Sequence, residues 1–222
     1  MSQEASGIRI GRNSYVHPSA VLEGSITIGE WSWVAAGAML TGRVTIGDGT
    51  YIGERSVLSG EITVGDHTRI QIGVVIRGRN TIGDYVNIYD LVNIEGGRPR
   101  GYHDSDDRSV IGDRAWVNHG ATMHGSQLGE EAAVGINAAL DYNTVLGRGA
   151  ILANGSATTV NTTIPDNCIA QGVPARVVKE NITDRDRIEL MGLVPAEWVV
   201  VEAKGIMDFV RAQLAAMGRL EE

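Results

Sequence analysis

The segment IGEWSWVAAGAMLTGRVTIG, residues 28–47, contains the pattern that decides the fold. Its aliphatic residues Ile28, Val34, Leu40 and Ile46 follow one another at intervals of six. A period of six fits neither the 3.6-residue α-helix nor the two-residue alternation of a free-standing amphipathic strand. Short strands joined by regular corners do produce it. The segment therefore predicts a parallel β-helix built from hexapeptide repeats.

The same period extends outward from this segment in both directions. In steps of six, every position from Ile10 to Ile94 is aliphatic, and two residues before each lies a second row, small or β-branched at most positions. Aliphatic-Gly pairs recur every eighteen residues, at Ile10-Gly11, Ile28-Gly29, Ile46-Gly47, Val64-Gly65 and Ile82-Gly83. Three hexads therefore make one coil, and the chain is expected to climb a triangular prism around an aliphatic core.

The register breaks once and then resumes. Ile82-Gly83 and Ile111-Gly112 are 29 residues apart, which is one coil of eighteen plus an insertion of eleven. The inserted segment is polar and rich in turn residues, so we predict an extruded loop at about residues 96–109. The pattern then slips by one residue to Leu128 and continues to Ile164. Residues 1–178 are thus predicted to form the hexapeptide-repeat domain, with nine coil starts.

The hexads stop after Gly172-Val-Pro174, which leaves residues 179–222 as a C-terminal segment. Residues 184–191 are expected to form a short helix, whereas residues 198–201 are ambiguous between helix and strand. A second helix is expected from Gly205 to Gly218, with Gly218 as its C-terminal cap. One stripe of this helix is apolar, and we expect it to cover a wall of the prism. Its residues are Ile206, Phe209, Val210, Leu214 and Met217.

Composition excludes several classes of protein. Among 222 residues there are 29 Gly and one Phe, which suits many turns around a thin aliphatic core. No apolar run is long enough to cross a bilayer, and the N-terminal residues lack the features of a signal peptide. The single Cys168 excludes an intramolecular disulfide framework and suits a reducing cytoplasm. A net charge of −8 without a basic cluster argues against nucleic acid as a partner.

The predicted register places distant residues side by side. Arg77, Glu95, His124 and Asp141 form one outward column on successive coils. Tyr89 and Asn118 stack in a second column, and Asp90 and His119 stack beside them. The extruded loop begins directly after Glu95. Because inserted loops often carry function, this cluster is the candidate site.

At these residues the sequence resembles the γ-class carbonic anhydrases. The matching motifs are Asn87-Ile-Tyr-Asp90, Glu95, Ile111-Gly112 and His119-Gly-Ala-Thr-Met-His124-Gly125, within a resemblance over about residues 10–178. It implies a left-handed parallel β-helix and a homotrimer. In that family three His bind a divalent metal between two subunits, and His119 and His124 match two of them. The resemblance thus implies a divalent metal, with zinc as the expected ion and iron as the alternative.

The sequence departs from the family motif at three places. Glu95 stands where the family has its first metal-binding His, Tyr89 stands where it has Gln, and its Arg-Gly-Asp motif reads Arg77-Gly78-Arg79. Two His and one carboxylate still suit zinc or iron. We therefore predict a metal-dependent, carbonic-anhydrase-like lyase or hydrolase with weak or no CO2 hydration. Arg77 and Arg79 favour a small anionic substrate over neutral CO2.

The sequence leaves the roles of several residues open. Glu95 binds the metal or pairs with Arg77, and Tyr89 is a general acid or a capping aromatic. Asp90 is assigned to the catalytic cluster beside His119. His103, in the loop, is a proton shuttle, a substitute ligand or a solvated side chain. His17 and His67 are interpreted as solvated surface residues.

Aromatic residues on the outer walls, such as Trp31, Trp33 and Trp116, are expected at a subunit interface. Two other functional classes compete with the metalloenzyme. One is a CoA-dependent acyltransferase in which one His is a general base. The other is a scaffold without catalytic activity. Metal content and CoA binding separate the three.

Overall fold

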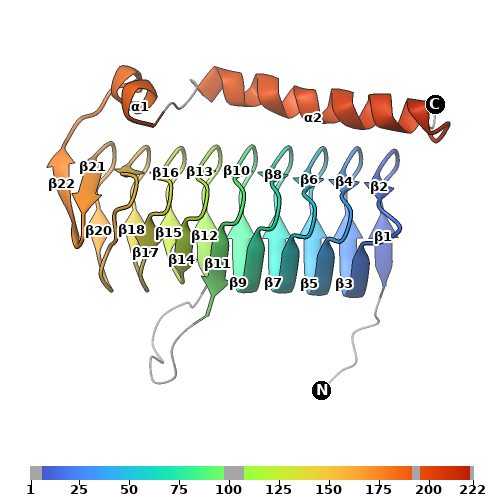
Figure 1. Cartoon of the computed structure of the whole chain (residues 1–222), viewed down its shortest axis with the longest axis horizontal. Helices are drawn as coiled ribbons and strands as arrows, with labels where there is room; N and C mark the ends of the chain where they lie inside the picture. The colour runs from blue at the N-terminus through green and yellow to red at the C-terminus, as the bar shows by residue number, and fades with distance from the viewer. Residues whose placement is uncertain (1–6, 98–107, 192–195, 221–222) are drawn as a thin grey trace.

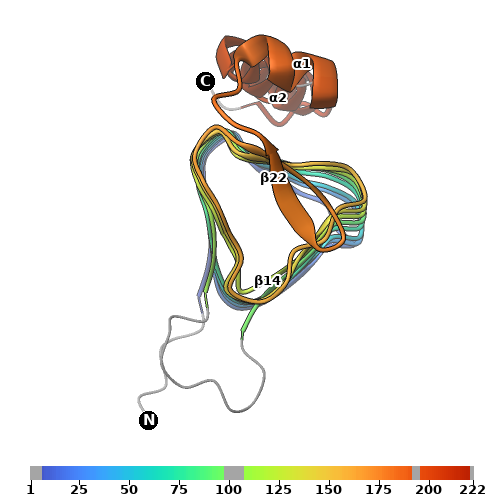
Figure 2. The same cartoon turned by 90° about the vertical axis from the view of Figure 1, so that its left-hand side faces the viewer.

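Each coil of the chain consists of three short strands joined by three corners, and the coils stack into a triangular prism (Figures 1 and 2). The structure is a computed structural model and describes residues 7–97, 108–191 and 196–220. Helices lie over one face of the prism, and the strands that flank the inserted segment end and begin at the opposite corner (Figure 2). The predicted all-β, left-handed parallel β-helix with a C-terminal helical tail is confirmed.

The three faces are called the first, second and third face, in the order in which the chain meets them. Strands that belong only to the first face are β1 (Ile8–Ile10), β12 (Ser109–Ile111), β15 (Gln127–Leu128), β18 (Val145–Leu146) and β20 (Thr163–Ile164). Second-face strands are β2 (Tyr15–Val16), β4 (Trp33–Val34), β6 (Tyr51–Ile52), β8 (Arg69–Ile70), β10 (Asn87–Ile88), β13 (Trp116–Val117), β16 (Ala133–Val134), β19 (Ile151–Leu152) and β21 (Ile169–Gly172). Third-face strands are β11 (Asn93–Gly96), β14 (Thr122–His124) and β17 (Ala139–Leu140).

In the first four full coils the third and first faces share long strands. These are β3 (Val21–Ile28), β5 (Met39–Ile46), β7 (Val57–Val64) and β9 (Val75–Ile82), each of 8 residues. Each turns the corner at a glycine with positive φ, for example 82° at Gly78. A Cβ on Gly78 would overlap the carbonyl oxygen of Gly96 in the next coil. Glycine is therefore required where the strands bend this closely.

The register predicted from the hexads is the register of the structure. Ile10 pairs with Ile28 and Ile28 with Ile46 in parallel strands. After the inserted loop, Ile82 pairs with Ile111, and Ile111 pairs with Leu128, so the predicted slip is confirmed. The path of the inserted loop lies mostly outside the described residues, and its flanking strands end at Gly96 and begin at Ser109.

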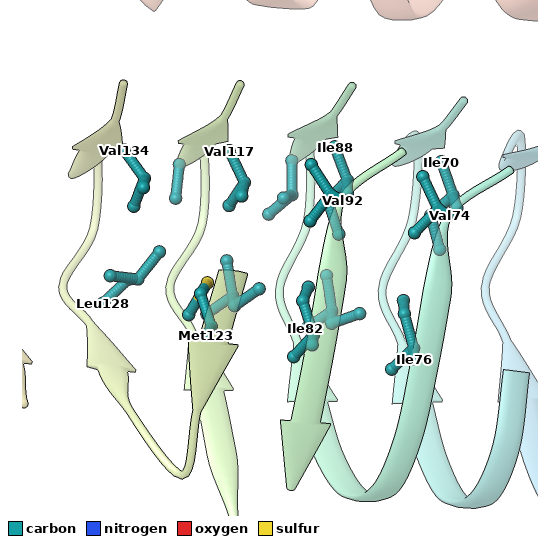
Figure 3. Close-up of a cluster of buried hydrophobic side chains, with 14 of the residues drawn as sticks. Ile70, Val74, Ile76, Ile82, Ile88, Val92, Val117, Met123, Leu128 and Val134 are labelled. Atoms are coloured by element: carbon teal, nitrogen blue, oxygen red, sulfur yellow. The ribbon is translucent and has the colours of Figure 1, made fainter. Parts of the chain in front are cut away.

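Aliphatic side chains from the three faces fill the interior in rows that run along the prism (Figure 3). Ile70, Ile88 and Val117, for example, are fully buried and stack on successive coils. The second row of small residues lines the corners. There the Thr50 hydroxyl donates to the Gly65 carbonyl at 2.9 Å and accepts from a backbone N–H of the next coil. The small β-branched row therefore satisfies corner backbone groups that neighbouring strands do not reach.

The C-terminal segment folds back over the second face. β22 (Ala175–Lys179) pairs antiparallel with β21, and α1 (Asp184–Met191) and α2 (Ala196–Ala216) follow (Figure 1). Helix α2 thus begins earlier than the predicted Gly205 and includes residues 198–201. Three residues of the predicted stripe, Ile206, Val210 and Leu214, are buried against Tyr15, Trp33 and Tyr51. This side of α2 therefore lies on the second face.

Helix α2 ends as its sequence predicts. Gly218 has a φ of 64° and donates its N–H to Ala215 O at 3.0 Å. Arg219 N donates to Leu214 O at 2.8 Å, which completes a Schellman motif. Phe209 and Met217, two other residues of the predicted stripe, are 42% and 41% exposed and lie at its margin. No helix among the described residues is long and apolar enough to cross a membrane.

Arg187 holds helix α1 to the C-terminal coils of the prism. Its guanidinium donates to Gly149 O at 2.6 Å and also to Glu131 O. Burial lowers the pKa of Arg187, and the two carbonyl acceptors satisfy its charge. At the start of the helix, Thr183 N donates to Asp186 Oδ2 at 2.9 Å as part of an N-terminal cap. Together these contacts fix the direction in which the chain leaves β22.

Candidate functional site

The predicted column of Arg77, Glu95 and His124 exists at the corner between the third and first faces. Glu95 pairs in register with Arg77 on β9 and with His124 on β14. Adjacent parallel strands lie about 4.8 Å apart, so the Glu95 and His124 side chains leave the corner as neighbours. Arg77 Nη2 lies 3.9 Å from Glu95 Oε2, and both side chains are about half exposed. Glu95 therefore has a cation on one side and an imidazole on the other.

Buried polar side chains hold this corner from inside the prism. Ser126 Oγ donates to His124 O at 2.9 Å, and Ser109 Oγ donates to Glu95 O at 3.2 Å. Asn80 Nδ2 donates to the carbonyl of Arg77 at 2.8 Å. In the coils below, the same inward position is aliphatic: Ile26, Val44 and Ile62. The six-residue period does not predict this change, whose sequence signal is the switch from aliphatic to polar residues at the level of the loop.

His119 lies at the other edge of the third face, at its corner with the second face. Its Nδ1 is 3.4 Å from Asp90 Oδ2. Asp90 Oδ1 accepts the backbone N–H of Ile72 at 3.0 Å, so the carboxylate is anchored to the coil below. The Tyr89 ring lies against the imidazole, with 4.9 Å between centroids. The predicted neighbours Tyr89, Asp90 and His119 are thus brought together around one imidazole.

Two residues of the predicted set remain, Arg79 and His103, and one neighbour of the set, Tyr142, was not predicted. Arg79 Nε lies 3.6 Å from Glu61 Oε2, one coil below, so it belongs to the same corner as Arg77. His103 lies outside the described residues. Tyr142 was not predicted, although its ring stacks on His124 with 5.1 Å between centroids and an interplanar angle of 36°. His124 is therefore bounded by Tyr142 above and Glu95 below.

The two histidines stand at opposite edges of the third face. Strand β14 begins after His119 and ends at His124, and the corner turn at Gly120 lies before it. Among the described residues, no three His, Cys, Asp or Glu side chains gather closely enough to hold a metal ion. Within one chain, Glu95 and His124 therefore lie at one edge of the third face and His119 lies at the other.

An exposed apolar strip runs along the corner that carries His119. It consists of Ile72, Leu91 and Ile136, which are 42%, 70% and 40% exposed. Leu91 also has a φ of 61°, a conformation that costs a residue with a Cβ about 1–2 kcal/mol. The same conformation occurs at other corners, for example at Arg55 and Asn137, so it is the exposed apolar surface that marks this corner as a candidate contact surface.

The tryptophans expected at a subunit interface are covered by the chain itself, which corrects that prediction. Trp33 packs against Tyr15 and Phe209, with ring centroids 4.2 Å and 5.3 Å away. Arg211 lies over the ring of Trp31. Trp116 is buried in a cluster that includes Ile182, from the segment before α1. The hexad pattern contains no information about where the C-terminal segment packs. From the sequence alone, these rings were therefore expected to be exposed on the outer walls.

Known proteins place this geometry in context. No family model matches the chain. The carnitine operon protein CaiE from Escherichia coli K12 is 32% identical over 94 residues, which cover 42% of this chain and 46% of CaiE. The mitochondrial γ carbonic anhydrase 2 of Arabidopsis thaliana is 35% identical over 78 residues, 35% of this chain and 28% of that protein. The chain thus spans less than half the length of these curated relatives.

Solved structures support the fold. The Arabidopsis UDP-N-acetylglucosamine acyltransferase superposes with a TM-score of 0.62 at 17% identity, covering 83% of this chain and 68% of that one. The UDP-N-acetylglucosamine O-acyltransferase (LpxA) of Moraxella catarrhalis gives 0.61 at 16%, covering 81% and 73%. At this identity the likeness shows the fold alone. Together with the sequence relatives, it confirms the predicted resemblance to γ-carbonic-anhydrase-like hexapeptide-repeat proteins.

Proposed function

We propose that the chain forms a homotrimer with a divalent metal site at each subunit interface, and that it is a lyase or hydrolase acting on a small anionic substrate. The supporting observation is that the Glu95–His124 pair and His119 occupy opposite edges of one face. A closed three-fold ring brings one edge of a subunit against the other edge of its neighbour. Such a ring joins His119 of one subunit to Glu95 and His124 of the next.

The surfaces left free by the tail agree with this assembly. The second face is covered by α1, α2 and the segment before them, so a subunit contact uses the other two faces. The first face presents a ladder of threonines that includes Thr45 and Thr63, whereas the third face presents exposed Val21 and Met39. Apolar surface on the third face, together with the corner strip of Ile72, Leu91 and Ile136, favours burial of this face against a second copy.

The donor chemistry of the cluster fits a divalent metal. A metal-binding His ordinarily gives its second ring nitrogen to a carboxylate, and Asp90 stands in that position beside His119 Nδ1. His119 Nε2 is then the nitrogen left for an ion. Two imidazoles and the Glu95 carboxylate are a donor set that suits zinc, and iron is the alternative. A metal bound there would act as a Lewis acid and lower the pKa of a coordinated water.

The surrounding side chains have separate roles in this proposal. The Glu95 carboxylate gives up its contact with Arg77 when it binds the metal, because a carboxylate bound to a metal interacts more weakly with a guanidinium. Arg77 then becomes available, with Arg79 beside it on the same corner, to bind the carboxylate or other anionic group of a substrate. Tyr89 lies against His119 and supplies or removes a proton near the substrate. His103 is proposed as a second proton carrier from the loop.

The test is the metal content of purified protein. Wild-type chain is expected to hold one ion per subunit, and His119→Ala and His124→Ala are each expected to lose it. Glu95→Gln is expected to weaken binding less, since an amide oxygen still donates. His17→Ala is the matched control, because His17 is remote from His119 and His124 and bonded to Ser19 Oγ at 2.8 Å. Metal retained without either histidine, or a monomer at micromolar concentration, would contradict the proposal.

A second candidate, a CoA-dependent acyltransferase, draws support from the His119–Asp90 pair. A carboxylate at a histidine Nδ1 orients the ring and raises its basicity, so Nε2 can remove a proton from a hydroxyl or amine. In this case His119 is required and His124 is not. Binding of CoA to metal-free protein, with activity lost in His119→Ala but kept in His124→Ala, would favour acyl transfer over the metal-dependent reaction.

A further inference from the structure

A cavity of about 440 Å³ lies between helix α2 and the second face, and none of its lining residues is a histidine. Its floor is made by residues of β6 and β8 and of the corners that follow them, and its roof by α2. The lining residues are Tyr51, Glu54, Arg69, Gln71, Ile72, Gly205, Ile206 and Phe209. A cavity of this size, apolar on one side and with a few polar groups on the other, is typical of a small-molecule site.

The charged groups of the cavity do not neutralise each other. Tyr51 Oη donates to Glu54 Oε2 at 3.3 Å. Burial raises the pKa of Tyr51 to about 12, with Glu54 adding to the effect, so the hydroxyl keeps its proton at neutral pH. In the described part of the chain no ion pair joins Arg69 to Glu54 or to another carboxylate. Among the described residues, the cavity therefore offers one cation without an ion pair, Arg69, and one carboxylate, Glu54, that accepts a single side-chain hydrogen bond.

The apolar side of the cavity is built around Gly205. Glycine within a helix is unfavourable relative to alanine, yet a Cβ at Gly205 would meet no atom within 4 Å. Close packing thus does not explain this glycine. Its bare surface widens the cavity between Ile206 and Phe209, and the Phe209 ring stands edge-on to Tyr51 at 6.3 Å. Two aromatic rings beside a carboxylate form an environment that favours binding of an organic cation.

We propose that this cavity binds a small zwitterion of the amino-acid type. Its ammonium group faces Glu54 and the aromatic rings, and its carboxylate faces Arg69. Its apolar part lies against Ile206 and Phe209. A ligand with only a negative charge would be repelled by Glu54, and a ligand with only a positive charge would be repelled by Arg69. Only a ligand with both charges complements both side chains. This site requires no metal and none of the residues assigned to the proposed reaction. Its lining residue Ile72 also belongs to the corner strip, so in the proposed trimer the cavity lies beside the subunit contact.

The test uses three probes with the same apolar body, measured by calorimetry on the full chain. L-Phenylalanine carries both charges, 3-phenylpropanoate only the carboxylate and phenethylamine only the ammonium; L-leucine checks an aliphatic body. We expect at least one of the two amino acids to bind at least about tenfold more tightly than either singly charged probe. Arg69→Gln and Glu54→Gln should each remove this preference, and Arg185→Gln, whose side chain is 84% exposed on α1, should not.

A steric variant makes the test independent of charge. Gly205→Leu introduces a good helix former whose side chain fills the cavity, so it should abolish binding while leaving the thermal unfolding temperature unchanged or higher. Ala215→Leu, at an exposed position of the same helix, is the matched control and should bind normally. Failure of both amino acids to bind at millimolar concentration, equal binding of all probes, or unchanged binding by Gly205→Leu would overturn the proposal.

Discussion

Leu91 offers the most direct test of the assembly, because its two unusual properties predict opposite effects of one substitution. The side chain is 70% exposed and its φ is 61°. Asparagine adopts this left-handed conformation more readily than leucine. In an isolated subunit, Leu91→Asn is therefore expected to raise the free energy of unfolding by about 1 kcal/mol.

In the proposed trimer the same substitution removes apolar contact from each interface. Burying a whole leucine side chain contributes about 1.5–3 kcal/mol, so covering the exposed 70% contributes about 1–2 kcal/mol. A subunit that leaves a closed ring breaks two interfaces, so its dissociation becomes easier by about 2–4 kcal/mol, or roughly 30- to 1000-fold in the dissociation constant. The backbone strain is present in free and assembled subunits alike and does not change this difference.

Sedimentation velocity over a dilution series measures the dissociation constant of the assembly. Urea unfolding at concentrations where the chain is monomeric measures the free energy of unfolding of the single subunit. The control is Val178→Thr, because Val178 is 60% exposed on β22, which pairs with β21 of the second face. It should leave association unchanged. The reasoning fails if Leu91→Asn stabilises the subunit without weakening assembly, since the strip would then not lie at the interface.

Three other outcomes are expected. Gly78→Ala should destabilise the chain by at least about 2 kcal/mol in urea unfolding, because φ is 82° and the next coil leaves no room for a methyl group, whereas Gly97→Ala, with nothing within 4 Å, should change little. The Lys179 hydrogen bond lowers the pKa of Asp186 to about 2, below its usual 3.8. The ionised Asp186 therefore stabilises the fold fully above pH 4, and this contribution is lost as the pH falls through 2. In Asp186→Asn the melting temperature should depend less on pH over that range. Stopped-flow assays should find little or no CO2 hydration in the wild type, and a gain in Glu95→His; hydration at the rate of an active γ-class enzyme would refute the argument from ligand loss.

The sequence by itself determined the coils and the columns. A six-residue period is a local property, and parallel stacking converts it directly into neighbours in space, since each coil repeats the path of the last. For this reason Glu95 could be placed between Arg77 and His124, and Asp90 beside His119, without coordinates. The insertion and the one-residue slip were equally visible, because the aliphatic positions on either side fix the register.

Only the tertiary structure decided what lies outside the repeat. The hexads specify which side chains point outward, but not which of them another segment will cover, so Trp33 and Trp116 could not be assigned to the tail. The cavity beneath Gly205 has the same origin, because it exists only where α2 crosses β6 and β8. Helix docking depends on the fit of two surfaces that are far apart in sequence, and no periodic pattern records that fit.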